Sequence, residues 1–193
     1  MFQAKPREPD VSEKIQNIIR RASREDVPVN QGVHNNTHDV MRIKMLTLET
    51  LLSNEDILKA LHHPVYSLEE HPNKDLFRYT SIFPFLNVPL DKADVKNFLC
   101  FEVNSYGSGK LMKNQLVIRI ISHTDDIETD WGIPRTDLID MIISEEIDWT
   151  TRFGATLEKV QDVAGVFASG YLYRDLVYEL VSSNNGYRLV NGG

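Results

Sequence analysis

The segment 107–110, Gly-Ser-Gly-Lys, comes closest to a phosphate-binding motif in this chain. In a phosphate-binding loop, the lysine and the hydroxyl group of the residue after it serve the phosphate and a magnesium ion. Here Leu111 takes the place of the hydroxyl residue, and Asn104 takes the place of the leading glycine. We therefore interpret the segment as a hairpin loop, in which small residues and one lysine are ordinary.

A pair of histidines four residues apart, His34 and His38, would lie on one face of a helix as metal ligands, with Asp39 nearby. The intervening segment 35–37, Asn-Asn-Thr, favours a loop, and the spacing identifies no third ligand. Three more histidines flank turns and are expected on the surface: His62, His63 and His71.

Four carboxylates close together in the chain could bind a hard cation through their oxygens: Asp125, Asp126, Glu128 and Asp130. The twelve-residue calcium loop, with its central glycine and terminal glutamate, is absent from this segment. We interpret it as a solvated acidic turn, and a metal site here stays an open alternative.

Two enzyme classes lack their residue patterns. A two-metal nuclease needs carboxylates on adjacent strands with a lysine close by, and Glu102 and Glu158-Lys159 come nearest without the acid-x-lysine spacing. A nucleophile is not evident either, because Cys100 lies inside an apolar run and no serine occupies a Gly-x-Ser-x-Gly turn. We assign no catalytic residue, no metal ligand and no cofactor, and we expect a protein that is not an enzyme.

The charge and composition of the chain limit the kinds of partner that we expect it to bind. Of the net charge of −7, most comes from residues 101–150, which hold ten acidic residues against four basic ones. Proteins that bind nucleic acid specifically usually present a basic face, so we expect no specific DNA binding. The single cysteine allows no intrachain disulfide, and no apolar run approaches the roughly 18 residues of a membrane span. We expect a soluble protein made in a cytoplasm.

The first part of the chain is predicted to be helical. We expect an N-terminal arm over residues 1–45, with a short helix from Ser12 and a polar linker over 26–39. A longer helix is predicted from Val40 to Leu61, with Asn54 as an internal cap that divides it in two. It ends at 62–64, His-His-Pro, because the residue before proline avoids the helical region. The Pro-containing segment Leu76 to Val88 is expected to form an extended edge strand.

The second part is predicted to form a sheet covered by a helix. Apolar runs at Phe98–Val103 and Gln115–Ser122 predict a hairpin with a loop over 104–114. A helix over Arg135–Ile147 follows, and two more strands follow at Thr156–Val163 and Tyr171–Val181. Four residues are expected to form the buried stripe of that helix: Leu138, Ile139, Ile142 and Ile143. We further expect Trp149 and Phe153 to fasten the end of this helix to the sheet, and Gly165 and Gly170 to share the last turn.

The resulting fold class is α/β (α+β), with a small mostly antiparallel sheet packed by one long helix, N-terminal helices and an extended arm. The core domain is expected over residues 46–183, followed by a flexible C-terminal tail over 184–193.

This order of elements resembles the tail terminator proteins of tailed bacteriophages over about Leu46 to Ser182. The local sequences that carry the resemblance are Leu-Val-Ile-Arg-Ile-Ile-Ser-His at 116–123, the helix at 135–147, and Tyr-Leu-Tyr-Arg-Asp-Leu-Val-Tyr at 171–178. The chain departs from that family in residues 1–45 and in the segment Leu76 to Pro89.

The resemblance implies a structural virion protein without catalysis, located in the tail or neck and assembled in the host cytoplasm. It implies a ring, usually of six copies, that caps the tail tube and joins it to the head connector or neck protein. DNA would pass through the channel of the ring without specific binding, and we expect the acidic stretch 125–148 to border that channel. No contact with a membrane is implied.

Three alternatives stay open. The chain could be another neck or baseplate component of a phage. It could be a metal-dependent nuclease or hydrolase that uses some of the residues His34, His38, Asp125, Asp126 and Asp130. It could also be a monomeric adaptor or inhibitor that binds one protein partner through the aromatic segment Phe77 to Phe85.

Overall fold

The computed structural model describes residues 36–86, 95–107, 113–150, 152–153 and 156–181. Within them, helices α2 (Asn36–Ser53) and α3 (Glu55–Ala60) and the short helices η1 (Tyr66–Leu68) and η2 (Lys74–Leu76) come first. Strands β1 (Ile82–Phe83), β2 (Asn97–Tyr106) and β3 (Lys113–His123) follow. The short helix η4 (Thr124–Asp126), helix α4 (Arg135–Ile147) and strands β4 (Thr156–Ala168) and β5 (Tyr171–Val181) complete the fold.

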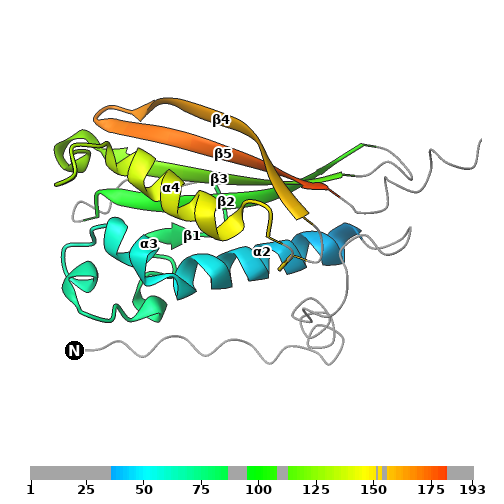
Figure 1. Ribbon diagram of the computed structural model, residues 1–193, viewed down its shortest axis with the longest axis horizontal. Coiled ribbons are helices and arrows are strands. Elements are labelled where there is room, and N and C mark those ends of the chain that lie inside the picture. The colour runs from blue at the N-terminus through cyan, green and yellow to red at the C-terminus, as the bar shows by residue number, and fades with distance from the viewer. Residues whose placement is uncertain (1–35, 87–94, 108–112, 151, 154–155, 182–193) are drawn as a thin grey trace, which may run out of the picture.

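The five strands form one sheet in the order β1-β2-β3-β5-β4. All neighbours are antiparallel except β1 and β2, which pair in parallel through two residue pairs. Figure 1 shows α4 crossing one face of the sheet and α2 running below the β2 side of it. The prediction of a mostly antiparallel sheet packed by helices is confirmed.

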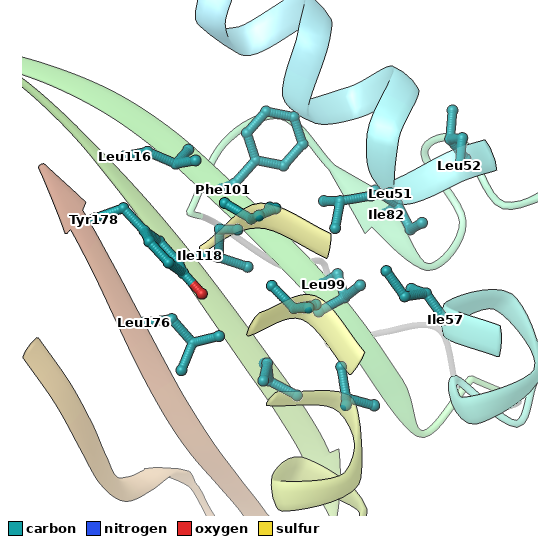
Figure 2. Close-up of a cluster of buried hydrophobic side chains, with 14 of the residues drawn as sticks. Leu51, Leu52, Ile57, Ile82, Leu99, Phe101, Leu116, Ile118, Leu176 and Tyr178 are labelled. Atoms are coloured by element: carbon teal, nitrogen blue, oxygen red, sulfur yellow. The ribbon is translucent and has the colours of Figure 1, made fainter. Parts of the chain in front are cut away.

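The main core lies between the helices and the sheet. Alternate residues of β2, β3 and β5 point toward the helices, as the period of two in a strand requires. Figure 2 shows this layer, in which Leu51 and Ile57 of the helices meet strand residues such as Leu99, Ile118 and Leu176. In α4, Ile139 and Ile143 are fully buried, whereas Leu138 and Ile142 pack at the margin of the core.

Asn54 separates α2 from α3, as predicted. Its side-chain oxygen accepts hydrogen bonds from the backbone N–H groups of Asp56 and Ile57, at 3.0 and 3.1 Å. This is the capping contact that satisfies the free donors at the start of a helix. The helix ends at Ala60, just before the His-His-Pro segment.

Helix α2 begins earlier than the sequence predicted. The segment 35–37 was expected to be a loop, yet the helix starts at Asn36 and carries Asp39 in its first turn, where an acidic residue suits the helix dipole. The expected domain boundary at residue 46 falls inside this helix, and Ile43, on the arm side of that boundary, is fully buried in the main core. The predicted helix at Ser12 and the tail over 184–193 lie outside the described residues.

The bounds of two segments and one predicted contact also differ from the prediction. In the described part of the segment Leu76 to Val88, only Ile82–Phe83 is an edge strand, because a turn occupies most of 77–81 and bends occupy 84–86. The hairpin strands β2 and β3 extend to Tyr106 and from Lys113, so they take residues that were assigned to the loop. Trp149 fastens the end of α4 to the sheet through its backbone N–H, which donates to the carbonyl oxygen of Leu157 on β4 at 2.8 Å, whereas its ring is not packed there, since the residue is 66% exposed. Phe153 is buried as expected.

Gly165 is a strand residue, not a turn residue. The turn between β4 and β5 contains Gly170, which has a φ of 77°, while Gly165 pairs with Tyr173 inside the ladder. A Cβ atom at position 165 would lie 2.8 Å from the ring of Tyr173. The glycine is therefore there to let the tyrosine ring lie against the strand backbone.

Candidate functional site

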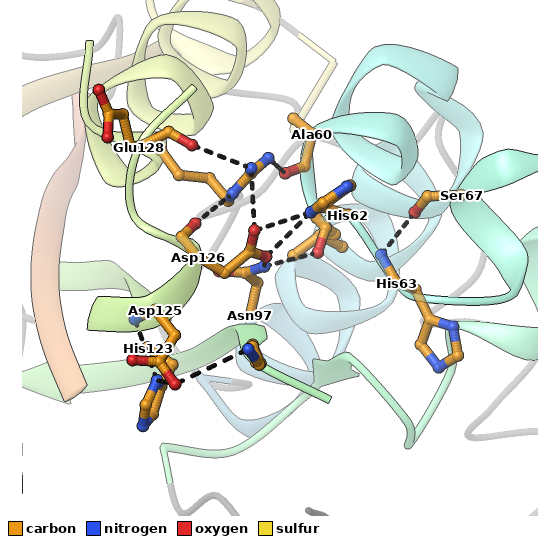
Figure 3. Close-up of polar contacts among 12 residues, drawn as sticks. Ala60, His62, His63, Ser67, Asn97, His123, Asp125, Asp126 and Glu128 are labelled. Carbon is orange, nitrogen blue, oxygen red and sulfur yellow. Dashed lines mark hydrogen bonds and ion pairs between the residues drawn. The ribbon is translucent and has the colours of Figure 1, made fainter. Parts of the chain in front are cut away.

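A polar cluster around Asp126 connects the end of α3, strand β2 and the start of α4 (Figure 3). The Asp126 carboxylate accepts hydrogen bonds from Asn97 Nδ2 at 2.6 Å and from Arg135 Nη2 at 3.2 Å. It also lies 2.8 Å from His62 Nδ1. Arg135, which is 8% exposed, donates further to the carbonyl oxygens of Asp126 at 2.7 Å and Ala60 at 3.0 Å. One arginine thus ties the end of α3 to the start of α4.

His62 and Asp126 have the geometry of a histidine oriented by a carboxylate. In catalytic sites such a histidine acts on a nucleophile or on substrate through its other ring nitrogen. Here Asp126 already serves Arg135 and Asn97, and among the described residues no nucleophilic side chain contacts His62. The left-handed φ of 47° at His62 follows from its place just after a helix end, where that conformation is common. The cluster cross-links the end of α3, strand β2 and the start of α4.

The other carboxylates of the acidic turn do not converge with Asp126. Asp125 lies 3.8 Å from Lys96 Nζ and is exposed, and only the backbone carbonyl of Glu128 faces Arg135, at 3.5 Å. Asp130 is exposed. In the part of the chain that the structure describes, no three His, Cys, Asp or Glu side chains are grouped so that they could hold a metal ion. His38 lies in α2, but His34 is outside the described residues.

His63 is buried, which corrects the expectation of a surface histidine. Its ring stacks on Tyr66 with centroids 4.1 Å apart, and its Nδ1 accepts hydrogen bonds from the backbone N–H groups of Val65 and Tyr66, each at 3.2 Å. Burial lowers the pKa of His63, so the neutral ring is favoured. His71 is exposed and lies 3.2 Å from Glu55.

A second polar cluster lies between α4 and the sheet, and the sequence analysis missed it. Lys159 Nζ on β4 donates to Asp140 Oδ1 and Ser144 Oγ, both at 2.9 Å. Ser144 Oγ also donates to Asp140 Oδ1 at 2.9 Å and lies 3.5 Å from the hydroxyl of Tyr178. Burial raises the pKa of Tyr178. The i, i+4 spacing of Asp140 and Ser144 on one helix face was the only signal available in the sequence.

This arrangement of serine, lysine and tyrosine resembles the side-chain set of a serine hydrolase, but its lysine is engaged by carboxylates. A lysine that activates a serine must offer a free lone pair. Lys159 forms an ion pair with Asp140 at 2.9 Å and lies 3.8 Å from Asp162. As arranged here, the amine of Lys159 is bound to the Asp140 carboxylate and links β4 to α4.

Arg174 extends the same cluster along β5. Its guanidinium contacts three carboxylates: Asp137 at 2.7 Å, Asp140 at 3.1 Å and Asp162 at 2.8 Å. These belong to α4 and β4, so the arginine holds the helix and both strands of the last hairpin together. The ion pairs with these carboxylates raise the pKa of Arg174 against the opposing effect of its burial.

The remaining candidates for chemistry are also engaged or far apart. Glu102 on β2 forms an ion pair with Lys44 of α2, and Glu158 is on β4, with β3 and β5 between the two strands. Cys100 is fully buried, and burial raises the pKa of its thiol to about 12. Gly107 ends the described part of the phosphate-loop-like segment, and residues 108–110 lie outside it.

The sheet face opposite the helices is built around Arg119 and Asp175. The guanidinium of Arg119 lies over the rings of Tyr173, at 5.0 Å, and Phe167, at 5.7 Å. Toward the β1 end, this face carries a small second core, which consists of Phe83, Val95, Phe98, Cys100 and Ile121. Helices α2, α3 and α4 contribute to the main core on the other face.

The aromatic side chains of the segment 77–85 are partly buried in the core and partly exposed at the surface. Phe77 and Phe83 are buried, whereas Tyr79 and Phe85 are 52% and 39% exposed and stack on each other with centroids 6.4 Å apart. Among the described residues, no helix combines the length and apolar character that a bilayer crossing requires.

The comparisons with known proteins place the chain in a family. A family model described as YomW matches residues 54–180, which include α3, α4, strands β1 to β4 and all of β5 except its last residue. The search of curated proteins found no match. The search of solved structures found none either. The family takes its name from a phage-derived region of Bacillus, so this is a phage-related protein. The chain, with its helix-covered five-stranded sheet, belongs to the YomW family.

Proposed function

We propose that this chain is a structural protein of a tailed phage particle, which caps the tail tube as a ring and joins it to the head connector. The observation that carries the proposal is that the charged side chains most suited to catalysis form ion pairs within the fold. Asp126, Asp140, Lys159 and Arg174 are all engaged in internal ion pairs that join elements of the fold. The phage-related family supports the same class of role.

The open form of the sheet supports assembly with other chains. A sheet with an uncovered edge strand must protect that edge, and neighbours in a symmetric ring are one way to do so. Strand β4 is such an edge, and the residues from Val160 to Ala164 on it are exposed in succession. The ring partners would be copies of this chain, with the tail tube protein below and the connector above.

The exposed acidic side chains suit a channel that DNA passes through. Asp125, Glu128 and Asp130 lie together on the turn before α4 and are exposed. Carboxylates repel the phosphate backbone, so DNA would slide past them without sticking. In this proposal, the turn before α4 faces the channel of the ring.

Deletion of the gene in its phage tests the role directly. The expected result is a lysate in which DNA-filled heads and tails accumulate unjoined, with infectivity restored by the wild-type chain from a plasmid. Electron microscopy with a labelled chain should place it where the tail meets the head. Label at the baseplate end would favour a baseplate component instead, and normal particle yield without the chain would exclude the proposal.

A single substitution separates this role from an enzymatic one. Ser144→Ala removes the hydroxyl group that would be the nucleophile of a serine hydrolase, and it leaves the Lys159–Asp140 ion pair in place. A structural ring should keep full infectivity with this variant, whereas a serine hydrolase would lose it. Lys44→Ala, which removes an ion pair near the surface of α2, is the matched control for a general effect on folding.

A further inference from the structure

Strand β4 has the properties of an edge that pairs with another strand. It is the outermost strand of the sheet, and its residues from Val160 to Ala164 are exposed in succession. Three valines on it are well exposed: Val160 at 48%, Val163 at 37% and Val166 at 72%. Edge strands of proteins that stay apart usually carry lysines, prolines or inward charges that prevent pairing. Between Val160 and Val166 there is no lysine, arginine or proline.

The single charge in this stretch is already neutralised. Asp162 lies 2.8 Å from Arg174 Nε on β5 and 3.8 Å from Lys159 Nζ. A chain with a net charge of −7 is repelled by its own copies over most of its surface. The β4 edge is a place where two copies can approach without that penalty.

The irregular positions of β4 define the length of the usable edge. The ladder with β5 shifts register between Lys159 and Gln161 and again between Val166 and Ala168. These bulges bend the strand and end regular pairing. The run between them, Gln161–Val166, is regular and exposes its free backbone edge.

The opposite edge of the sheet is less accessible to an incoming strand. Strand β1 covers β2 at Leu99 and Cys100, and Lys44 of α2 reaches Glu102 on β2. Figure 1 shows α2 running beside that part of the sheet. An incoming strand therefore finds β4 more accessible than β2.

We infer that β4 pairs with β4 of a second copy, antiparallel and about a two-fold axis at Val163. This register places Val163 opposite its own counterpart, Asp162 opposite Ala164, and Gln161 opposite Gly165. Like charges are never directly opposite, which is the condition for a favourable cross-strand pair. The paired segment is therefore Gln161–Gly165 of each copy, and the exposed Val166 lies just beyond it. The inference concerns the free protein: in the proposed ring the same β4 edge would meet a neighbour instead, so the two-fold pair would open on assembly.

The mass of the full chain in solution, measured by sedimentation over a range of concentrations, tests the pairing. The wild-type chain should form a reversible dimer. Val163→Lys places two ammonium groups opposite each other and should shift the dissociation constant at least tenfold toward the monomer. Val65→Lys, at a valine that is 61% exposed in the turn after α3, is the matched control and should leave the dimer unchanged. A wild-type chain that stays monomeric, or a dimer that survives Val163→Lys, would overturn the inference.

Cross-linking tests the register. Opposite residues of an antiparallel pair have Cα atoms about 4.5–5.5 Å apart, within the reach of a disulfide. Val163→Cys should therefore form a disulfide-linked dimer under mild oxidation, much faster than Val65→Cys does. The native Cys100 is fully buried and should not contribute. Equal slow rates for the two variants would show that β4 does not meet its counterpart at Val163, and circular dichroism of both variants confirms that they fold.

Discussion

Arg119 on β3 and Asp175 on β5 face each other across the sheet and form two parallel hydrogen bonds, each 2.7 Å long. Their side chains are only 23% and 16% exposed. The hydrogen bond to Asp175 raises the pKa of Arg119 despite its partial burial. A bidentate pair of this kind is stronger and more specific in geometry than an ordinary surface ion pair. It lies at the centre of the sheet face that the described helices leave open.

Asp175→Ala should lower the free energy of unfolding by about 2 kcal/mol, because it leaves a partly buried guanidinium without its partner. Lys113→Ala is the control, since the Lys113–Glu179 pair is exposed and should contribute about 0.5 kcal/mol or less. Urea unfolding followed by circular dichroism measures both values. Similar losses in the two variants would mean that the Arg119–Asp175 pair stabilises the sheet no more than a surface contact does.

Arg135→Ala should destabilise the fold more strongly, by about 3 kcal/mol, since it removes a buried side chain and leaves the carbonyl oxygens of Ala60 and Asp126 without their donor. Arg135→Lys should recover little of this loss, because one ammonium group cannot reproduce the planar fork of the guanidinium. Thermal unfolding of the two variants measures the effect. Arg152→Ala, at an arginine whose side chain is 49% exposed, should cost less than 1 kcal/mol.

The order of strands and helices was readable from the sequence because it depends on local patterns. The period-two alternation in 115–122 and the apolar stripe of 135–147 gave β3 and α4, and Asn54 gave the break between α2 and α3. The start of α2 was missed, since the polar residues before Asp39 favour a loop when read alone. Burial of Ile43 against the sheet overrides that preference.

The polar clusters could not be predicted, because their members are far apart in the chain. Arg135 and Ala60 are separated by 75 positions, and only the packing of α3 beside the start of α4 brings them together. The acidic residues at 125–130 looked like one group in the sequence. In the structure Asp126 turns inward to Arg135 while its neighbours stay at the surface.

Gly165→Ala should lower the free energy of unfolding by about 1 kcal/mol, because the added methyl group would lie 2.8 Å from the Tyr173 ring that packs on Arg119. The double variant Gly165→Ala with Tyr173→Ser removes the clash and should show a non-additive recovery in a double-mutant cycle. Urea unfolding of the four proteins gives the coupling. Additive losses would show that the ring simply moves aside.

The last prediction concerns pH and the contact between Tyr106 and Glu179. The Tyr106 hydroxyl donates to the Glu179 carboxylate, which raises the pKa of Tyr106 to about 12 and, with help from Lys113, lowers the pKa of Glu179 below its usual 4.5. A lowered folded-state pKa of an acid means that its stabilisation is present above pH 4.5 and is lost as the pH falls through the folded value. For the tyrosine, the raised pKa means that stabilisation is present below pH 10 and is lost as the pH rises through about 12.

Tyr106→Phe should therefore reduce the free energy of unfolding by a constant amount between pH 6 and 9, below about 1 kcal/mol because both side chains are near the surface. The difference from the wild-type chain should shrink below pH 4.5 and above pH 10. Urea unfolding across this range measures it, and the difference in absorbance at 295 nm between the wild-type chain and Tyr106→Phe isolates the ionisation of Tyr106 from that of the other tyrosines. A difference that stays constant from pH 3 to pH 11 would mean that the hydroxyl does not hold the Glu179 carboxylate in solution.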